Sequence, residues 1–332
     1  MKGLGALHRV RRRQVLIGLG GVLTARTPAR ATRLHQLAIL EGTSAEAARH
    51  YLAPFEAALR ERGHHVNRDL RIVYRFADGN AGRYADLAQE IVLSDPDVIM
   101  TGSTTAALAC AKLSNRVPIV SSNLTDPVGA GLISSLARPG TNVTGVTVSL
   151  DGLPAKILHL LSEVLPGPRK IGVLANANER ASQRQLEEAR RAAQELGLTF
   201  VVTDIGSAAD FDRAFAELRQ GGASAVYAPS SLLLRTEKRQ FAEASLAARM
   251  PVFCNALEIA QAGALLSYGA DLRENYRRAG YFVDRILRGA WPGDLPTENP
   301  TRFVCAINVG TARKLGVTVP PALFAFADEI IE

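Results

Sequence analysis

The chain has 332 residues, of which 47% are hydrophobic, and this is enough for two globular domains of ordinary size. The formal net charge of +7 comes from the first 31 residues, which hold seven basic residues and no acidic one; removing those seven from 39 leaves 32 basic residues against 32 acidic ones. The rest of the chain is therefore neutral and lacks the basic surface of a nucleic-acid-binding protein, so we exclude nucleic acid as a partner.

The N-terminal segment has the pattern of an export signal. Arg11-Arg12-Arg13 precede a short apolar stretch, "VLIGLGGVLTA", and Ala29-Arg30-Ala31 has the A-x-A form that a signal peptidase cleaves. The apolar stretch is shorter than the ~20 residues that span a bilayer. We predict a signal peptide over residues 1–31, cleaved after about Ala31, that sends the chain to the periplasm. The paired arginines resemble a twin-arginine signal, but the usual Ser or Thr before them is absent, so the general secretory route stays open.

After this segment, short apolar runs alternate with amphipathic helical patterns. The runs predict strands at 37–40, 70–76, 97–100 and 117–120. Between the second and third runs, apolar residues from Tyr84 to Val92 recur with the spacing of one helix face. Pro54 lies in another helical pattern and predicts either a helix start or a kink. Strands separated by helices predict βαβ units and a parallel sheet.

From residue 169 the same order of elements repeats, with an offset of about 130 residues. Residues 170–178 mirror 36–44, and residues 250–256 mirror 117–123. We therefore predict an α/β protein with two similar Rossmann-like lobes, each with a parallel sheet, joined by a hinge.

The C-terminal segments are too few for a third domain. Strand patterns at 263–269 and 302–309 and a helix pattern at 275–289 predict pieces that cross between the lobes and complete both sheets, and residues 136–149 would form the first crossing. We expect the first lobe to contain residues 34–149 plus about 272–300. The second lobe would contain residues 150–271 plus about 301–332.

Polar loops follow the predicted strands, where ligands bind in open parallel sheets. They lie at 42–44, 102–105 and 121–126 in the first lobe and at 176–178, 229–231 and 255–258 in the second. Ser, Thr and Asn lie there at helix starts, whose free N–H groups suit a carboxylate or phosphate. The run Ser103-Thr104-Thr105 could add hydroxyl donors to a ligand or could serve only as N-caps.

Other polar residues of these loops are equally open to two interpretations. Asp126 could hold a substrate ammonium or simply cap the next helix, and Glu258 carries the same ambiguity. Asn176 offers an amide without reactivity. Tyr268 could stack on a ligand or belong to the core.

Signatures of catalysis and of cofactor binding are missing from the chain. It has no Walker P-loop, no G-x-S-x-G motif and no convincing dinucleotide fingerprint, and the six histidines lie outside the polar loops. Cys110, Cys254 and Cys305 lie too far apart in sequence to indicate a disulfide framework or a metal site. We therefore predict a protein without catalytic residues, metal or cofactor.

Several stretches together resemble the bacterial ABC transporter substrate-binding proteins of the tryptophan/tyrosine-binding type. They include "DVIMTGSTTAALA", "ARPGTNVTGV" and "LPTENPTRFVCAINVGTARKLGVTVP", and the resemblance runs from about residue 34 to the C-terminus. It implies a periplasmic binding protein type I fold whose two lobes close on a small ligand, which is then handed to a membrane permease.

The resemblance also implies a set of ligand-binding residues. Ser103, Thr104 and Thr105 would line the carboxylate end of the ligand, and Asp126 would lie on the third loop of the same lobe. From the second lobe the residues expected to close on the ligand are Asn176, Ser230, Asn255 and Tyr268. Where many family members carry an acidic residue or a phenylalanine, this chain has Pro229-Ser230-Ser231-Leu232. That departure counts against an aromatic amino acid as the ligand.

We therefore predict the solute-binding component of an ABC importer, a monomer that closes by hinge motion on an amino acid or a similar carboxylate. One alternative is a periplasmic receptor that passes its signal to a signalling protein, which the sequence does not separate from transport. The other is a two-lobed α/β enzyme such as a racemase, but Cys254 has no partner thiol near Ser103. No DNA-binding helices precede the first lobe, which argues against a repressor.

Overall fold

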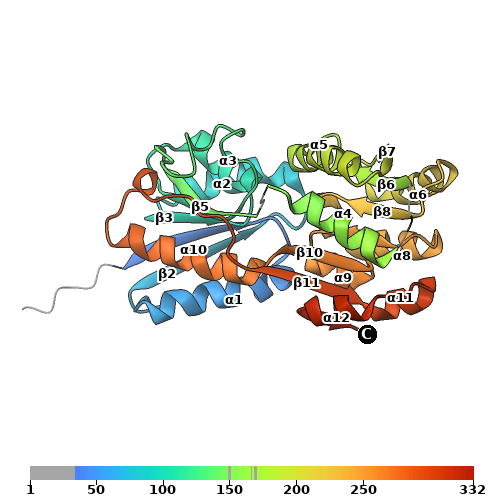
Figure 1. The fold of residues 1–332 in the computed structure, drawn as a ribbon. Coiled ribbons are helices and arrows are strands. Elements are labelled where there is room, and N and C mark those ends of the chain that lie inside the picture. Colours follow the sequence, from blue (N-terminus) through green and yellow to red (C-terminus); the bar gives the residue numbers. More distant parts are fainter. Residues whose placement is uncertain (1–33, 149–150, 166, 168–169) are drawn as a thin grey trace, which may run out of the picture. The chain divides into compact units, whose positions relative to one another are not determined.

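Two β-sheets organise the protein, which we analysed as a computed structural model that describes residues 34–148, 151–165, 167 and 170–332 (Figure 1). The predicted signal peptide, residues 1–31, lies outside the described residues. The first lobe contains β1 (His35–Glu41), α1 (Ala45–Glu61), β2 (Leu70–Phe76), α2 (Tyr84–Leu93), β3 (Val98–Thr101), α3 (Thr104–Leu113), β4 (Ile119–Leu124), β5 (Val143–Thr147) and, from later in the chain, α10 (Leu272–Leu287).

The second lobe is built mainly from the following half of the chain. Its elements are α4 (Leu153–Val164), β6 (Lys170–Ala175), α5 (Arg180–Glu195), β7 (Thr199–Asp204), α6 (Phe211–Gln220), β8 (Ala225–Ala228), α7 (Leu232–Thr236), α8 (Lys238–Ala247), β9 (Val252–Cys254), α9 (Leu257–Ala262), β10 (Leu266–Ala270), β11 (Phe303–Asn308), α11 (Val309–Leu315), α12 (Pro321–Phe326) and β12 (Glu329–Ile331). Short 3-10 turns occur at Ala81–Arg83, Ala208–Asp210 and Pro292–Asp294.

The first sheet has the strand order β2-β1-β3-β4-β5, and all its pairings are parallel. Helices α1 and α10 pack on one face, and α2 and α3 pack on the other. Figure 1 shows α10 beside α1, although more than 200 residues separate them in the sequence. A parallel sheet covered on both faces requires apolar side chains on both, and residues 37–40 of β1 are accordingly fully buried.

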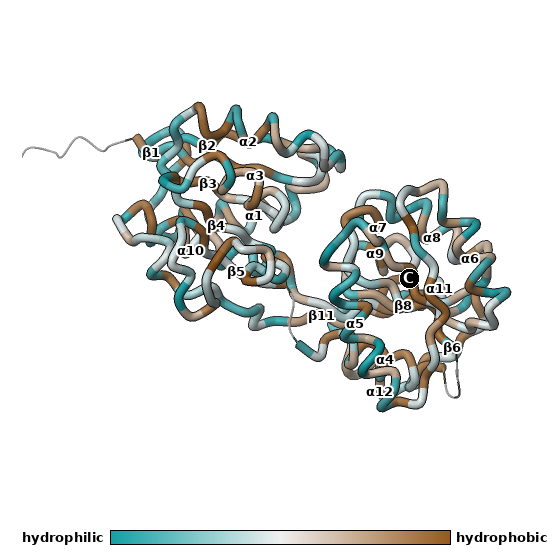
Figure 2. Tube along the Cα trace, turned by 90° about the horizontal axis from the view of Figure 1, so that it is seen from above, coloured by the Kyte–Doolittle hydropathy of each residue, from teal (hydrophilic) through white to brown (hydrophobic). Residues whose placement is uncertain are grey.

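The second sheet has the order β12-β11-β10-β9-β8-β6-β7 and is parallel except between β10 and β11. Apolar residues of α4, α5 and α12 cover one face, and residues of α6 and α8 cover the other. On that second face the rings of Phe211 and Phe215 pack against Phe241, with centroids 5.5 and 5.7 Å from it. In Figure 2 the apolar colour gathers on the strands, while the outer turns of α5 are hydrophilic.

The predicted fold class, two α/β lobes with mostly parallel sheets, is confirmed. Within it, one expectation was wrong: the C-terminal segments do not complete both sheets. Among the described residues they add β10, β11 and β12 to the second sheet, whereas the first lobe gains α10 and one bridge between Val146 and Glu298. The segment 136–149, expected as a crossing, contains β5, because Val143, Thr144 and Val146 extend the first sheet before the chain leaves it. Pro54 lies inside α1 and does not start it.

No helix among the described residues is long enough and apolar enough to cross a membrane.

Two glycines allow a close backbone approach at corresponding places in the two lobes. A Cβ on Gly145 of β5 would lie 1.9 Å from the carbonyl oxygen of Ser121, and a Cβ on Gly269 of β10 would lie 1.9 Å from that of Asn255. Gly145 also has φ +146°, which L-residues rarely adopt. Both glycines therefore fix how each sheet's polar loop packs on the next strand.

We predict that Gly145→Ala destabilises the protein more than the matched change Gly289→Ala. Gly289 also has a positive φ, +98°, but a Cβ there would meet nothing within 4 Å. The control should lose about 1 kcal/mol of unfolding free energy. Gly145→Ala should lose roughly 1–3 kcal/mol beyond that, because the backbone must move to relieve the overlap. Urea denaturation measures both values, and equal losses would contradict the packing argument.

Candidate ligand pocket

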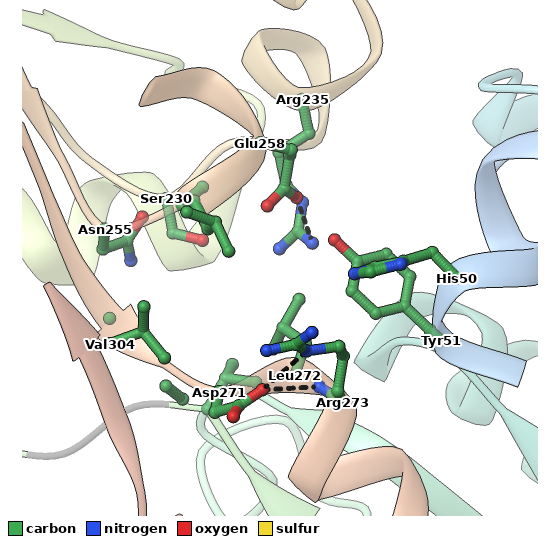
Figure 3. Close-up of a pocket in the computed structure, with 15 residues that line it drawn as sticks. His50, Tyr51, Ser230, Arg235, Asn255, Glu258, Asp271, Leu272, Arg273 and Val304 are labelled. Atoms are coloured by element: carbon green, nitrogen blue, oxygen red, sulfur yellow. Dashed lines mark hydrogen bonds and ion pairs between the residues drawn. The ribbon is translucent and has the colours of Figure 1, made fainter. Parts of the chain in front are cut away.

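A pocket lies where residues of both lobes meet, and its empty space, counted together with the solvent space at its mouth, is about 590 Å³ (Figure 3). The first lobe contributes His50 and Tyr51 of α1 and Val148, which follows β5. The second lobe and the start of α10 contribute Ser230, Arg235, Asn255, Ala256, Leu257, Glu258, Gly269, Ala270, Asp271, Leu272, Arg273 and Val304.

An ion pair between Arg235 and Glu258 is the charged centre of the pocket. The Nη2 atom of Arg235 lies 2.5 Å from Oε1 of Glu258, and the two side chains are 26% and 12% exposed. Burial, the largest single influence, lowers the pKa of Arg235, but Glu258 together with Tyr51 and Tyr276 more than offsets it, so the pKa is raised and the guanidinium stays charged. Its planar fork carries five N–H donors, and the ion pair engages it at Nη2.

Tyr51 connects this ion pair to the first lobe. Burial, followed by the charge of the nearby Glu258 carboxylate, raises the pKa of the Tyr51 phenol, which stays protonated. Figure 3 shows the ring pointing from α1 toward Arg235 and Glu258. On its other side the ring stacks on Tyr276 of α10, with centroids 5.4 Å apart. The pocket thus has one aromatic wall, provided by the first lobe.

The position of Arg235 follows from the way α7 is held. Ser231 caps this short helix by accepting a hydrogen bond from the Leu234 N–H. Glu179, just before α5, accepts from the Leu232 N–H at 2.7 Å and from the Ser231 hydroxyl at 2.9 Å. The Glu179 carboxylate therefore accepts hydrogen bonds from free N–H groups at the start of α7, groups that the sequence analysis had considered available to a ligand. Arg235, one turn further along α7, remains directed at the pocket.

Gln185 of α5 holds two of the predicted ligand-binding residues in place. Its side chain is 4% exposed, and its Oε1 accepts from the Ser230 N–H at 2.8 Å and from the Asn255 Nδ2 at 3.4 Å. Because the Asn255 amide nitrogen is directed at Gln185, its Oδ1 is the atom left to accept from a ligand. Sequence reasoning missed Gln185, since it lies in the middle of a helix and away from the polar loops.

A second guanidinium, that of Arg273, lies across the pocket from Arg235 (Figure 3). Its side chain is 47% exposed, and its Nε lies 3.7 Å from the Asp271 carboxylate. Asp271 caps α10 by accepting from the Arg273 N–H and also lies 3.5 Å from Arg302. The Asp271 charge is therefore balanced internally, whereas Arg273 can approach a ligand from the solvent side.

The structure gives internal roles to three of the four polar residues that the sequence predicted from the first lobe. Ser103 caps α3 by accepting from the Ala106 N–H. The Thr104 hydroxyl hydrogen-bonds to both backbone groups of Thr125. Asp126 pairs with Arg184 at 3.2 Å, and Thr105 is exposed on the first turn of α3. The described residues that line the pocket include none of these four.

Of the four residues predicted from the second lobe, Ser230 and Asn255 line the pocket, and Asn176 and Tyr268 do not. Asn176 is 5% exposed, and its amide donates to Glu179 and accepts from the Asn178 N–H. Tyr268 stacks on Phe303 and contacts Phe326, with centroids 5.7 and 5.9 Å away. Its ring therefore packs against the apolar core of the second lobe and does not line the pocket.

A buried carboxylate lies behind the first-lobe wall. Glu41, at the end of β1, is 3% exposed, and the Tyr276 hydroxyl lies 3.0 Å from each of its oxygens. The carboxyl group fits only because residue 102 is glycine, since a Cβ there would lie 2.2 Å from Oε2. Desolvation raises the pKa of Glu41 from 4.5 to about 7, although hydrogen bonds from Tyr276 and the Gly42 N–H partly oppose the shift.

Among the described residues, no group of three or more His, Cys, Asp or Glu side chains is arranged to hold a metal ion. Burial raises the pKa of the Cys110 and Cys254 thiols to about 12 and that of Cys305 to about 11. All three thiols are therefore protonated at neutral pH and poor nucleophiles.

The raised pKa of Glu41 predicts a pH-dependent contribution to stability. Between pH 4.5 and about 7 the folded protein keeps a proton on Glu41 that the unfolded chain has released, so the free energy of unfolding falls as pH rises through this window. The loss is on the order of 3 kcal/mol. Glu41→Gln, which cannot titrate, should lack it and become the relatively more stable protein at pH 8. Urea denaturation of both proteins at pH 5 and pH 8 tests this, and parallel pH profiles would contradict it.

Comparison with known proteins identifies the family. Residues 36–331 match the family described as ABC transporter substrate binding protein. A tyrosine-binding protein of Clostridioides difficile is 27% identical over 263 residues, which are 79% of this chain and 75% of that protein.

Solved structures agree with this match. A conserved domain protein of Vibrio cholerae is 27% identical with a TM-score of 0.84, and the match covers 90% of this chain and 100% of that one. An ABC domain of Streptococcus pneumoniae in complex with L-Trp has the same fold, at 23% identity and a TM-score of 0.83, over 90% of this chain and 99% of that one. The family expected from the sequence is confirmed: the chain belongs to the ABC transporter substrate-binding proteins.

Proposed function

We propose that the protein is the solute-binding component of an ABC importer and that it binds an amino acid or a similar small carboxylate in the pocket between its lobes. The observation that supports this proposal most strongly is the position of the Arg235 guanidinium in the pocket. Its guanidinium is largely buried, charged and directed into the pocket, where Glu258 is its ion-pair partner among the described residues. A guanidinium fork matches the geometry of a carboxylate and can bind it with two parallel hydrogen bonds.

The neighbours of Arg235 suit the remaining parts of an amino acid. Glu258 lies next to the guanidinium and would accept from an ammonium group, so the two ends of a zwitterion have adjacent partners. Ser230 and the Oδ1 of Asn255 would complete the polar contacts, and Arg273 would approach from the open side. The ligand side chain would lie against Tyr51 and Leu272.

The relatives support a ligand of this class. One is named a tyrosine-binding protein, and another was solved with L-Trp bound. In this chain the loop Pro229–Leu232 carries no aromatic residue, and the aromatic side chain of the pocket is Tyr51 on the opposite lobe. We therefore propose an amino acid without restricting it to an aromatic one.

The binding cycle would use hinge closure without chemistry. Val148, Asp271 and Val304 line the pocket close to segments where the chain passes between the lobes, so rotation there would open and close it. The cysteine thiols are buried and protonated and are not among the described residues that line the pocket, which counts against the pair of acid–base thiols that a racemase would use.

We also propose, from the N-terminal sequence pattern, export to the periplasm by the twin-arginine or the general secretory route, with cleavage after about Ala31. There the protein would act as a monomer that delivers its ligand to a membrane permease and has no nucleic-acid partner.

We predict that Arg235→Lys greatly weakens ligand binding while the fold is retained. Lysine keeps the charge beside Glu258 but loses the planar fork that binds a carboxylate. The measurement is the melting temperature of the purified protein against a panel of L-amino acids, each with its decarboxylated amine. At a hundred times its dissociation constant, a ligand adds about 2.7 kcal/mol of stability to the wild type. That gain should largely disappear in Arg235→Lys and should be absent for the amines.

Arg239→Ala is the matched control, because Arg239 is an exposed arginine on α8 and does not line the pocket. This variant should respond to ligand like the wild type. Full stabilisation of Arg235→Lys by an amino acid, or equal stabilisation of the wild type by an amine that lacks the carboxylate, would contradict the proposed role of Arg235.

A further inference from the structure

A polar contact outside the pocket of Figure 3 also joins the two lobes, and its residues Asp126 and Arg184 line a second, more open pocket. Asp126 lies in the loop after β4 of the first lobe, and its Oδ1 is 3.2 Å from Nη1 of Arg184 on α5 of the second lobe. One turn earlier on α5, Arg180 donates a hydrogen bond to the carbonyl oxygen of Gly129 at 2.9 Å. We refer to Asp126, Gly129, Arg180 and Arg184 as the interlobe contact.

The first-lobe loop presents the Asp126 carboxylate in one fixed orientation. Asp126 has φ +46°, in the left-handed region, and its Oδ1 accepts from the Gly129 N–H at 3.0 Å. A Cβ on Gly129 would lie 2.2 Å from Oδ2 of Asp126, so a larger residue at this position would require the carboxylate to shift. The carboxylate is therefore oriented by its own loop, independently of Arg184.

The hydroxyl of Thr104 fastens this loop to the rest of the lobe. Its Oγ1 accepts from the Thr125 N–H at 2.7 Å and lies 3.2 Å from the Thr125 carbonyl oxygen. Thr125 directly precedes Asp126. The hydroxyl-rich run after β3 thus supports the loop that carries Asp126, which accounts for a polar residue that the sequence had suggested for the ligand.

On the second lobe, Arg184 is oriented in a similar way. Its Nε lies 2.9 Å from Glu188 on the same helix, and its Nη2 lies 3.0 Å from Asp151 at the start of the second lobe. The remaining nitrogen, Nη1, faces Asp126. Both partners of the interlobe contact are therefore positioned by neighbours within their own lobes, so little side-chain entropy is lost when they meet.

We propose that the interlobe contact is a latch that stabilises the closed arrangement of the lobes, and that Asp126 acts on closure and does not bind the ligand ammonium. The latch rests on the hinge closure proposed above but is independent of the chemistry at Arg235. Both side chains are about one third exposed, so the ion pair should stabilise the closed arrangement only as much as a surface ion pair does. This corresponds to a change of about two- to fivefold in the closed-to-open ratio.

The test follows the lobe separation directly, by single-molecule fluorescence energy transfer in the purified protein without added ligand. Dyes on Leu113→Cys and Leu196→Cys report on opposite lobes, since both positions are exposed and the three native cysteines are buried. Asp126→Asn keeps an oxygen for the Gly129 N–H and removes the charge. It should reduce the closed-to-open ratio about two- to fivefold, and so should Arg184→Gln.

The double variant should lose no more than Asp126→Asn alone, because that change already removes the ion pairs of Asp126 with Arg184 and, at 3.8 Å, with Arg180. Salt at about 1 M, where the Debye length is about 3 Å, should shift the wild type in the same direction. Arg213→Gln is the control: Arg213 pairs with Asp210 and Glu217 inside the second lobe, so the ratio should not change.

Two results would overturn the latch. One is an unchanged ratio in Asp126→Asn, which with weaker amino-acid binding would assign Asp126 to the ligand. The other is full additivity of the two single changes, which would show that they act separately. Both results leave the ligand test on Arg235 untouched, so a failure of the latch is distinguishable from a failure of the proposed function.

Discussion

The ion pair between Arg235 and Glu258 is the interaction on which the proposed site depends. The two residues lie on separate short helices, α7 and α9, which follow neighbouring strands of the second sheet. Each charge stabilises the other in a largely buried setting, where an unpaired charge would be costly. Tyr51 of the first lobe lies near the same carboxylate, whose charge helps to raise the pKa of its phenol. A ligand that binds there therefore meets groups of both lobes that are already charged and oriented.

The protein's own carboxylates occupy most of the other polar positions near the strand ends. Glu179 binds the N–H groups of Leu232 and Leu233, and Asp271 caps α10. Glu41 is buried against Tyr276 behind Gly102. These internal partners satisfy backbone and hydroxyl groups that would otherwise compete for a ligand. They leave the guanidinium of Arg235, with donors beyond the one that engages Glu258, as the natural partner of a carboxylate.

The sequence was sufficient to predict the fold class. The apolar periodicity shows which side chains are buried in each helix and strand, and the internal repeat indicates two similar lobes. The sequence analysis did not predict β5, because its stretch "VTGVT" contains a glycine, which the close approach of the Ser121 carbonyl oxygen requires. It also predicted that the C-terminal strands complete both sheets, whereas they join only the second. Ser230 and Asn255 were found because they lie in loops after strands. A hydroxyl at a helix start looks the same whether it caps the helix, as Ser103 does, or touches a ligand. Arg235 was missed because its inward direction depends on Glu258, 23 positions further along the chain, and local patterns carry no such information.

The measurement that tests the central claim most directly is a crystal structure of the protein with the amino acid that stabilises it most. We predict the ligand carboxylate within about 3 Å of the Arg235 guanidinium nitrogens, with Tyr51 and Asn255 in contact with the same molecule. A ligand whose carboxylate instead lies on Ser103, Thr104 and Thr105, with Arg235 remote and bound only to Glu258, would contradict it.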